Sequence, residues 1–85
     1  MALMGRVLPD YRGFEFYIFP NDHGWPHVHV YKADGYAKIV IGNRRQAPWA
    51  IEVSRKMRDS DVKKAIQVIA ENQETLTEQW RKYRG

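Results

Sequence analysis

The sequence lacks cysteine and any long apolar run. Without cysteine the chain can form neither disulfide bonds nor a thiolate metal site, which is the usage expected in a reducing compartment. A membrane-spanning helix needs about 18 or more consecutive apolar residues, and neither such a run nor the apolar stretch of a signal peptide is present. We therefore expect a cytoplasmic protein with no membrane partner.

Most motifs of familiar enzymes are missing as well. The sequence has no glycine-rich phosphate-binding loop, no nucleophile elbow and no paired carboxylate motif. Its 85 residues are enough for one hydrophobic core, and 44% of them are hydrophobic, so we expect a single domain over residues 1–85. Whether that domain is an enzyme stays open at this point.

Positive charge is unevenly distributed. The net charge is +4, with nine basic and five acidic residues in 1–58 and five of each in 59–85. An excess of this kind permits an anionic partner, either nucleic acid or an acidic protein.

Alternating and aromatic-rich segments predict a sheet. Strands are expected at 14–19, 27–32, 36–41 and 49–53, with a weaker one at 6–8, and the short turn at 33–35 makes a hairpin of the second and third. Acidic residues at 59–61 and a three-four apolar spacing onward to Tyr83 predict a long C-terminal helix, bent or split at 72–75. The predicted fold class is therefore α+β, a small antiparallel sheet of three to four strands with the helix packed on one face.

Strand alternation separates two sets of side chains. The apolar set, expected to form the core under the helix, comprises Phe14, Phe16, Ile18, Val28, Val30, Ile39 and Ile41. The opposite face is expected to be open and to gather Glu15, Tyr17, His27, His29, Tyr31 and Lys38.

Three uses of this histidine face compete. Asp22, His23, His27 and His29 offer ligands for a divalent transition metal, because imidazoles at alternate strand positions converge. Alternatively, His27 or His29 acts as general base or acid in a metal-independent ribonuclease that needs no cofactor, and the phosphate charge is stabilised by one of three cations, Lys38, Arg44 or Arg45. In the third use, the face carries out no chemistry and docks a partner.

Four further residues are candidates for contact with a protein partner or RNA. Trp25 lies in a Gly-Trp-Pro turn beside the histidines and could be an exposed anchor. The others are Tyr31, on the histidine face, and the basic pair Arg44 and Arg45 in the loop before the last strand. An open sheet edge would also permit a homodimer.

The segment Tyr17-Ile-Phe-Pro-Asn-Asp-His-Gly-Trp-Pro-His-Val-His-Val30, followed by Gly35-Tyr-Ala-Lys-Ile39, resembles a family of small bacterial proteins catalogued as domain of unknown function 4160. Members carry an aspartate-histidine pair, a proline-containing turn and a histidine-x-histidine strand. Here Gly24-Trp25 stands where members often have a proline, and residues 44–53 match less well.

The resemblance implies a role but no mechanism. Genes of this family often lie beside a second small protein, catalogued as domain of unknown function 2442, in toxin-antitoxin-like arrangements. The implied role is one half of such a module, which binds its cognate protein, with Asp22, His23, His27 and His29 as the motif positions to test. The histidine face and the localised positive charge add RNA as a candidate partner.

Overall fold

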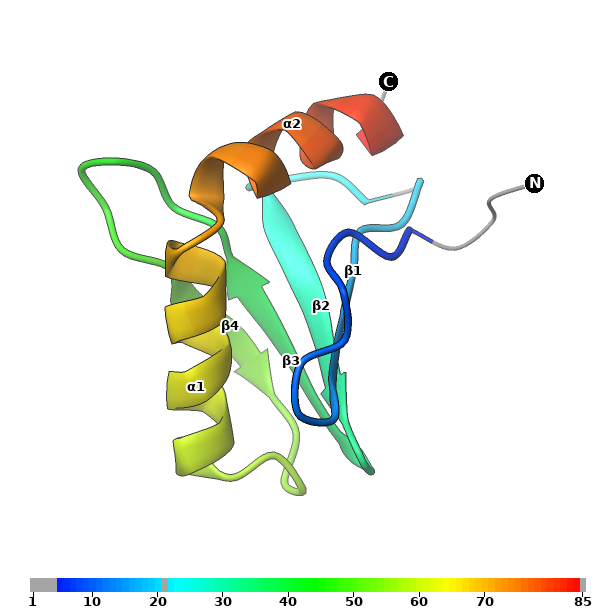
Figure 1. Cartoon of the computed structure of the whole chain (residues 1–85), viewed down its shortest axis with the longest axis vertical. Coiled ribbons are helices and arrows are strands. Elements are labelled where there is room, and N and C mark those ends of the chain that lie inside the picture. Colours follow the sequence, from blue (N-terminus) through cyan, green and yellow to red (C-terminus); the bar gives the residue numbers. More distant parts are fainter. Residues whose placement is uncertain (1–4, 21, 85) are drawn as a thin grey trace.

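A four-stranded antiparallel sheet with two C-terminal helices forms the protein (Figure 1). The computed structural model describes residues 5–20 and 22–84. Its strands follow one another in the order of the chain: β1 (Phe14–Tyr17), β2 (His27–Lys32), β3 (Gly35–Val40) and β4 (Trp49–Val53). The predicted α+β class is confirmed.

The helical segment is divided in two, as the interruption in its apolar spacing predicts. Helix α1 (Asp59–Ala70) ends at a turn through Glu71 and Asn72, and α2 (Gln73–Arg84) then runs in a new direction. In Figure 1, α1 lies along the sheet, whereas α2 turns away from it and crosses the end of the sheet at which β2 begins. No helix in the described part of the chain is long and apolar enough to span a membrane.

The core forms between the sheet and the helices, as strand alternation predicts. All seven residues of the predicted apolar set are buried, and they pack against a stripe of four buried helical residues, Ala65, Ile69, Leu76 and Trp80. The weak strand expected at 6–8 is not a strand but an isolated bridge between Arg6 and Tyr17. The first strand also ends earlier than expected, at Tyr17 instead of residue 19, because the chain turns into the loop that leads to β2.

The β2–β3 hairpin places an alanine in an unfavourable backbone conformation. Ala33 has a φ of 51°, in the left-handed region, where the Cβ of an L-residue meets the backbone at a cost of about 1–2 kcal/mol. Glycine avoids this contact because it has no Cβ.

We therefore predict that Ala33→Gly stabilises the protein by about 1 kcal/mol, measured as the free energy of unfolding in urea. The matched control is Ala47→Gly in the β3–β4 loop, because Ala47 is exposed and has no positive φ. That control is expected to destabilise the protein by about 0.5 kcal/mol through the entropy of the unfolded chain. Equal effects of the two substitutions would contradict the assignment of strain to Ala33.

Candidate metal site

Strand β2 directs two histidines to the same side of the sheet. Val28 and Val30 point into the core and are fully buried, so the alternating His27 and His29 face the other way. Their rings lie 5.0 Å apart, centroid to centroid. The prediction that these imidazoles share a face is confirmed.

A carboxylate from the β1–β2 loop meets both imidazoles. Asp22 is held by a tight turn in which its backbone N–H donates to the Phe19 carbonyl at 3.0 Å and its Oδ2 accepts from the Phe19 N–H at 2.8 Å. Both carboxylate oxygens lie 3.0 Å from His29 Nε2, and Oδ1 lies 3.7 Å from His27 Nε2. One nitrogen or oxygen from each of the three residues can be chosen so that all lie within 4.8 Å of one another.

His27 directs its ring nitrogen Nε2 toward this cluster, 3.7 Å from Asp22 Oδ1. Its Nδ1 lies 2.7 Å from the carbonyl oxygen of Trp25, which can only accept, so Nδ1 carries the proton. Burial lowers the pKa of His27 below 6.5 despite the opposing effects of the Trp25 carbonyl and Asp22, which favours the neutral ring. In that ring Nε2 is unprotonated, and no hydrogen bond from the described residues reaches it. Metal-binding histidines are typically oriented by such a bond from the other ring nitrogen.

His29 is hydrogen-bonded at both ring nitrogens. Nε2–H donates to Asp22, and the Tyr36 hydroxyl donates to Nδ1 at 2.9 Å. Burial raises the pKa of Tyr36 to about 12, so the phenol keeps its proton near neutral pH. If the imidazole proton moves from Nε2 to Nδ1, the Tyr36 oxygen can accept a hydrogen bond from Nδ1–H, and the unprotonated Nε2 can then bind a metal ion.

Asp22 remains ionised in spite of its burial. Burial is the largest single influence and raises the pKa of its carboxyl group. Hydrogen bonds from Phe19 and His29 and the attraction of both histidines together outweigh burial, and the pKa falls below 3.8. The cluster therefore combines one negative charge with two imidazoles, a donor set that suits zinc, iron and related divalent ions.

The histidine face is not open at this point, and the sequence-based expectation of an exposed His27 is wrong. His27 is only 5% exposed. Its ring packs on Trp80 of α2 with 5.0 Å between centroids, and the Phe19 ring lies 4.9 Å from that of His29. The physical reason is the change of direction after α1, which carries α2 across the end of the sheet.

Other predicted site residues lie around or away from the cluster. His23 is exposed and outside the group of three. Lys38 pairs with His29 across β2 and β3, with its Nζ 3.6 Å from a Glu52 carboxylate oxygen. Tyr31 packs against the rings of Tyr17 and Tyr36 on the same face.

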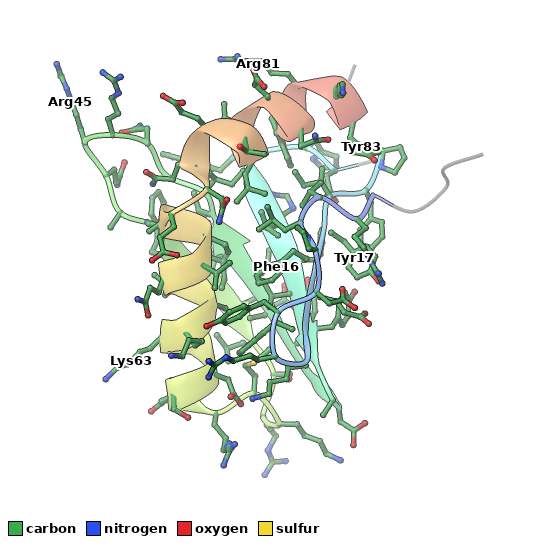
Figure 2. All side chains as sticks on the ribbon, in the orientation of Figure 1. Phe16, Tyr17, Arg45, Lys63, Arg81 and Tyr83 are labelled. Carbon is green, nitrogen blue, oxygen red and sulfur yellow. The ribbon has the colours of Figure 1, made fainter. Side chains whose placement is uncertain are left out.

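The loop and turn candidates are exposed. Trp25 is 67% exposed and its ring contacts that of Trp49. Arg44 and Arg45 are exposed in the β3–β4 loop, and Figure 2 shows Arg45 at its outer tip. Within residues 5–20 and 22–84, no hydrogen bond or ion pair joins this basic pair to the histidines, so the structure does not assemble them into one site with Lys38.

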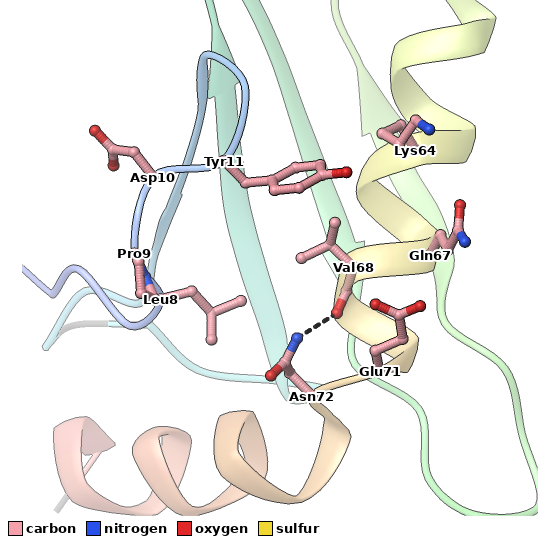
Figure 3. Close-up of a pocket in the computed structure, with 9 residues that line it drawn as sticks. All are labelled: Leu8, Pro9, Asp10, Tyr11, Lys64, Gln67, Val68, Glu71 and Asn72. Carbon is pink, nitrogen blue, oxygen red and sulfur yellow. Dashed lines mark hydrogen bonds between the residues drawn. The ribbon is translucent and has the colours of Figure 1, made fainter.

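A pocket of about 320 Å³ lies elsewhere, between the chain before β1 and helix α1 (Figure 3). Tyr11, Lys64 and Glu71 are among its lining residues, and none of the histidines is. The cluster is thus a tightly packed group of side chains, separate from this pocket.

Sequence reasoning missed three contributors: Tyr36, Phe19 and Trp80. Alternation places Tyr36 on the histidine face, and the hairpin pairs it with Tyr31, so its nearness to His29 could have been inferred. Trp80 falls within the apolar spacing that runs to Tyr83, which predicts only that it faces the sheet. Its contact with His27 depends on the path of α2, for which the apolar spacing carries no signal.

The chain belongs to the family described as Domain of unknown function (DUF4160), whose model matches residues 13–81. The match spans all four strands, α1 and most of α2, and it includes Asp22, His27 and His29. No match was found among curated proteins or among solved structures.

The lowered pKa of His27 predicts that the metal-free protein loses stability in acid. In the unfolded chain the imidazole of His27 takes up a proton near pH 6.5. In the folded chain the ring is buried beside Asp22, His29 and Lys38, and it takes up the proton only at a lower pH. Because the unfolded state then binds more protons, the free energy of unfolding should fall as the pH drops below about 6.5, by at most about 1.4 kcal/mol per pH unit.

Urea denaturation with a chelator between pH 8 and 5 measures this slope. His27→Gln has no imidazole at this position and should show a shallower decline over the same range. Asp22 contributes stability over a different pH range. Because the pKa of its carboxyl group is lowered in the folded chain, this stability is present above pH 3.8 and is lost as the pH falls through the pKa of the folded state. Identical slopes for the wild-type and His27→Gln proteins would be inconsistent with our interpretation of His27.

Proposed function

We propose that this member of the DUF4160 family is a metal-binding protein whose Asp22, His27 and His29 hold a divalent transition ion. The observation that carries the proposal is the convergence of one carboxylate and two imidazoles within 4.8 Å. Two ligands bound to one ion at about 2 Å each lie about 3–4 Å apart. The separations from Asp22 in the structure, 3.0 Å to His29 Nε2 and 3.7 Å to His27 Nε2, fall in this range.

The protonation states of the two histidines support the same function. His27 already has the tautomer that a metal ligand requires, because the Trp25 carbonyl holds its Nδ1–H. His29 requires only an internal proton shift, and Tyr36 can hydrogen-bond to Nδ1 in either tautomer. An ion between these groups would replace the direct hydrogen bond from His29 to Asp22 with two coordinate bonds.

The surroundings favour ion binding over contact with a large substrate. The side chains of Asp22 and His29 are each 12% exposed, and aromatic rings cover both histidines. RNA or a protein partner would reach little of either imidazole, whereas a single ion fits among them. The toxin-antitoxin-like role and the ribonuclease alternative stay predictions, and co-purification with the product of a neighbouring gene would test the first.

Metal binding is tested by titrating untagged, chelator-treated protein with Zn²⁺ or, anaerobically, with Fe²⁺. We expect one ion per chain and a melting temperature raised by about 10 °C at a hundredfold excess over the dissociation constant. Mg²⁺ should have no such effect, because it prefers oxygen ligands.

Two substitutions at neighbouring positions distinguish the loss of a metal ligand from a general effect of substitution in this loop. Asp22→Asn keeps an oxygen that can accept from His29 but removes the charge, and it should weaken binding by at least about tenfold. His23→Ala removes an exposed imidazole outside the cluster and should leave affinity unchanged. Equal affinity in these two variants, or less than one ion bound per chain, would refute the proposed site.

Tyr36 provides a further prediction about the orientation of His29. Tyr36→Phe removes the hydroxyl that contacts Nδ1 and should lower metal affinity by about 10-fold or more, as loss of such supporting hydrogen bonds does elsewhere. Tyr31→Phe is the matched control, because Tyr31 lies on the same face but makes only ring contacts with its described neighbours. Calorimetric titration of both variants decides whether the hydroxyl of Tyr36 matters.

A further inference from the structure

The two edges of the sheet differ in how they are covered. The outer edge of β1 is paired with the preceding chain: Val7 N–H donates to the Phe16 carbonyl at 3.0 Å, and Ile18 N–H donates to the Gly5 carbonyl at 2.7 Å. At the other edge, within the described residues, β4 pairs with β3 alone. Backbone groups along one side of β4 are therefore available to another strand.

Apolar side chains accompany this open edge. Ile51 is 52% exposed and Val53 is 45% exposed. A register irregularity places Lys38 opposite Glu52 but Ile39 opposite Ala50, so Ile51 between them has no cross-strand partner. At the start of the strand, Trp49 contacts the exposed ring of Trp25. Exposed edge strands usually carry outward charges or proline. Here Pro48 precedes β4 and Glu52 is an exposed charge within it, but Ile51 and Val53 are apolar side chains that would gain free energy when covered.

Basic residues lie at both ends of β4. Arg44 and Arg45 precede it in the β3–β4 loop, and Arg55 and Lys56 follow it. These four side chains are exposed, and among the described residues the three arginines make no ion pair. Lys56 lies 3.8 Å from Asp34, but both side chains are largely in solvent, where such a pair contributes little.

We propose that the free edge of β4 binds an extended segment of a partner protein by strand addition, and that acidic residues flank this segment. Backbone hydrogen bonds to β4 would supply affinity, with Ile51 and Val53 packing on alternate side chains of the added strand. Acidic flanks would meet the basic residues at both ends, which sets the orientation and speeds association. The inference is independent of the proposed metal site.

Charge disfavours a second copy of the chain as the occupant. In an antiparallel pair of β4 strands, the Arg44–Arg45 end of one copy meets the Arg55–Lys56 end of the other. Like charges would then face each other at both ends of the pair. The phosphates of RNA could pair with the basic residues, but RNA would bury little apolar surface on Ile51 and Val53. The apolar edge therefore favours a protein strand.

The probe is a short peptide with an alternating valine–threonine core and two glutamates at each end, compared with the same core flanked by lysines. In an NMR titration we expect the acidic peptide to shift the amide signals of residues 49–53 and to slow their hydrogen exchange. We expect it to bind about tenfold more tightly than the lysine-flanked peptide, with an advantage that shrinks as salt rises. Titrations with chelator and with Zn²⁺ should agree, so a failure here is distinguishable from failure of the metal proposal.

Two variants test the two parts of the surface. Ile51→Thr keeps a β-branched residue in an exposed position but removes apolar area, and it should weaken binding severalfold without changing the melting curve. Arg45→Glu should weaken binding of the acidic peptide by about tenfold, whereas Lys82→Glu, the same charge change at an exposed position of α2, should not.

Four results would overturn the proposal. These are equal affinity for the two peptides, amide shifts that leave residues 49–53 unaffected, and concentration-dependent dimerisation that Ile51→Thr abolishes. The fourth is binding of an oligouridylate that Arg45→Glu abolishes and Ile51→Thr leaves intact, because it would assign the basic residues to RNA.

Discussion

Burial of one face of the sheet beneath two short helices is the constraint on which the rest of the structure depends. A chain of 85 residues has one small core, and Phe16, Ile39 and Leu76 are among the side chains that fill it. Because strand side chains alternate, burying Val28 and Val30 sends the imidazoles between them to the opposite face. A slip of one residue in β2 would exchange the two sets, so the core also fixes the position of the histidines.

The opposite face is occupied by a buried polar cluster, whose stability depends on satisfied hydrogen bonds. A buried carboxylate is costly unless it is paired, and Asp22 receives hydrogen bonds from the Phe19 backbone and from His29. In the described part of the chain no buried side-chain nitrogen or oxygen lacks a partner. The carboxylate that fastens the β1–β2 loop to β2 is thus also the charged group that a divalent ion would require.

Trp25 connects the two surfaces for which we propose functions. Its backbone carbonyl orients His27, while its exposed ring packs on Trp49 at the start of β4. An ion held by Asp22 and His27 would fix both ends of the turn that carries Trp25. The turn that carries Trp25 therefore contacts both the proposed metal site and the start of β4, although the two proposals can be tested separately.

The sequence by itself determined the four strands of the sheet apart from their exact ends, the division of the helical segment and the assignment of His27 and His29 to one face, because these follow from local periodicity and turn residues. Membership of the family also came from the sequence. Only the tertiary structure decided that Asp22 joins the histidines while His23 does not, and that Trp80 buries His27. These contacts depend on the paths of a loop and of α2, which long-range packing sets and periodicity does not record.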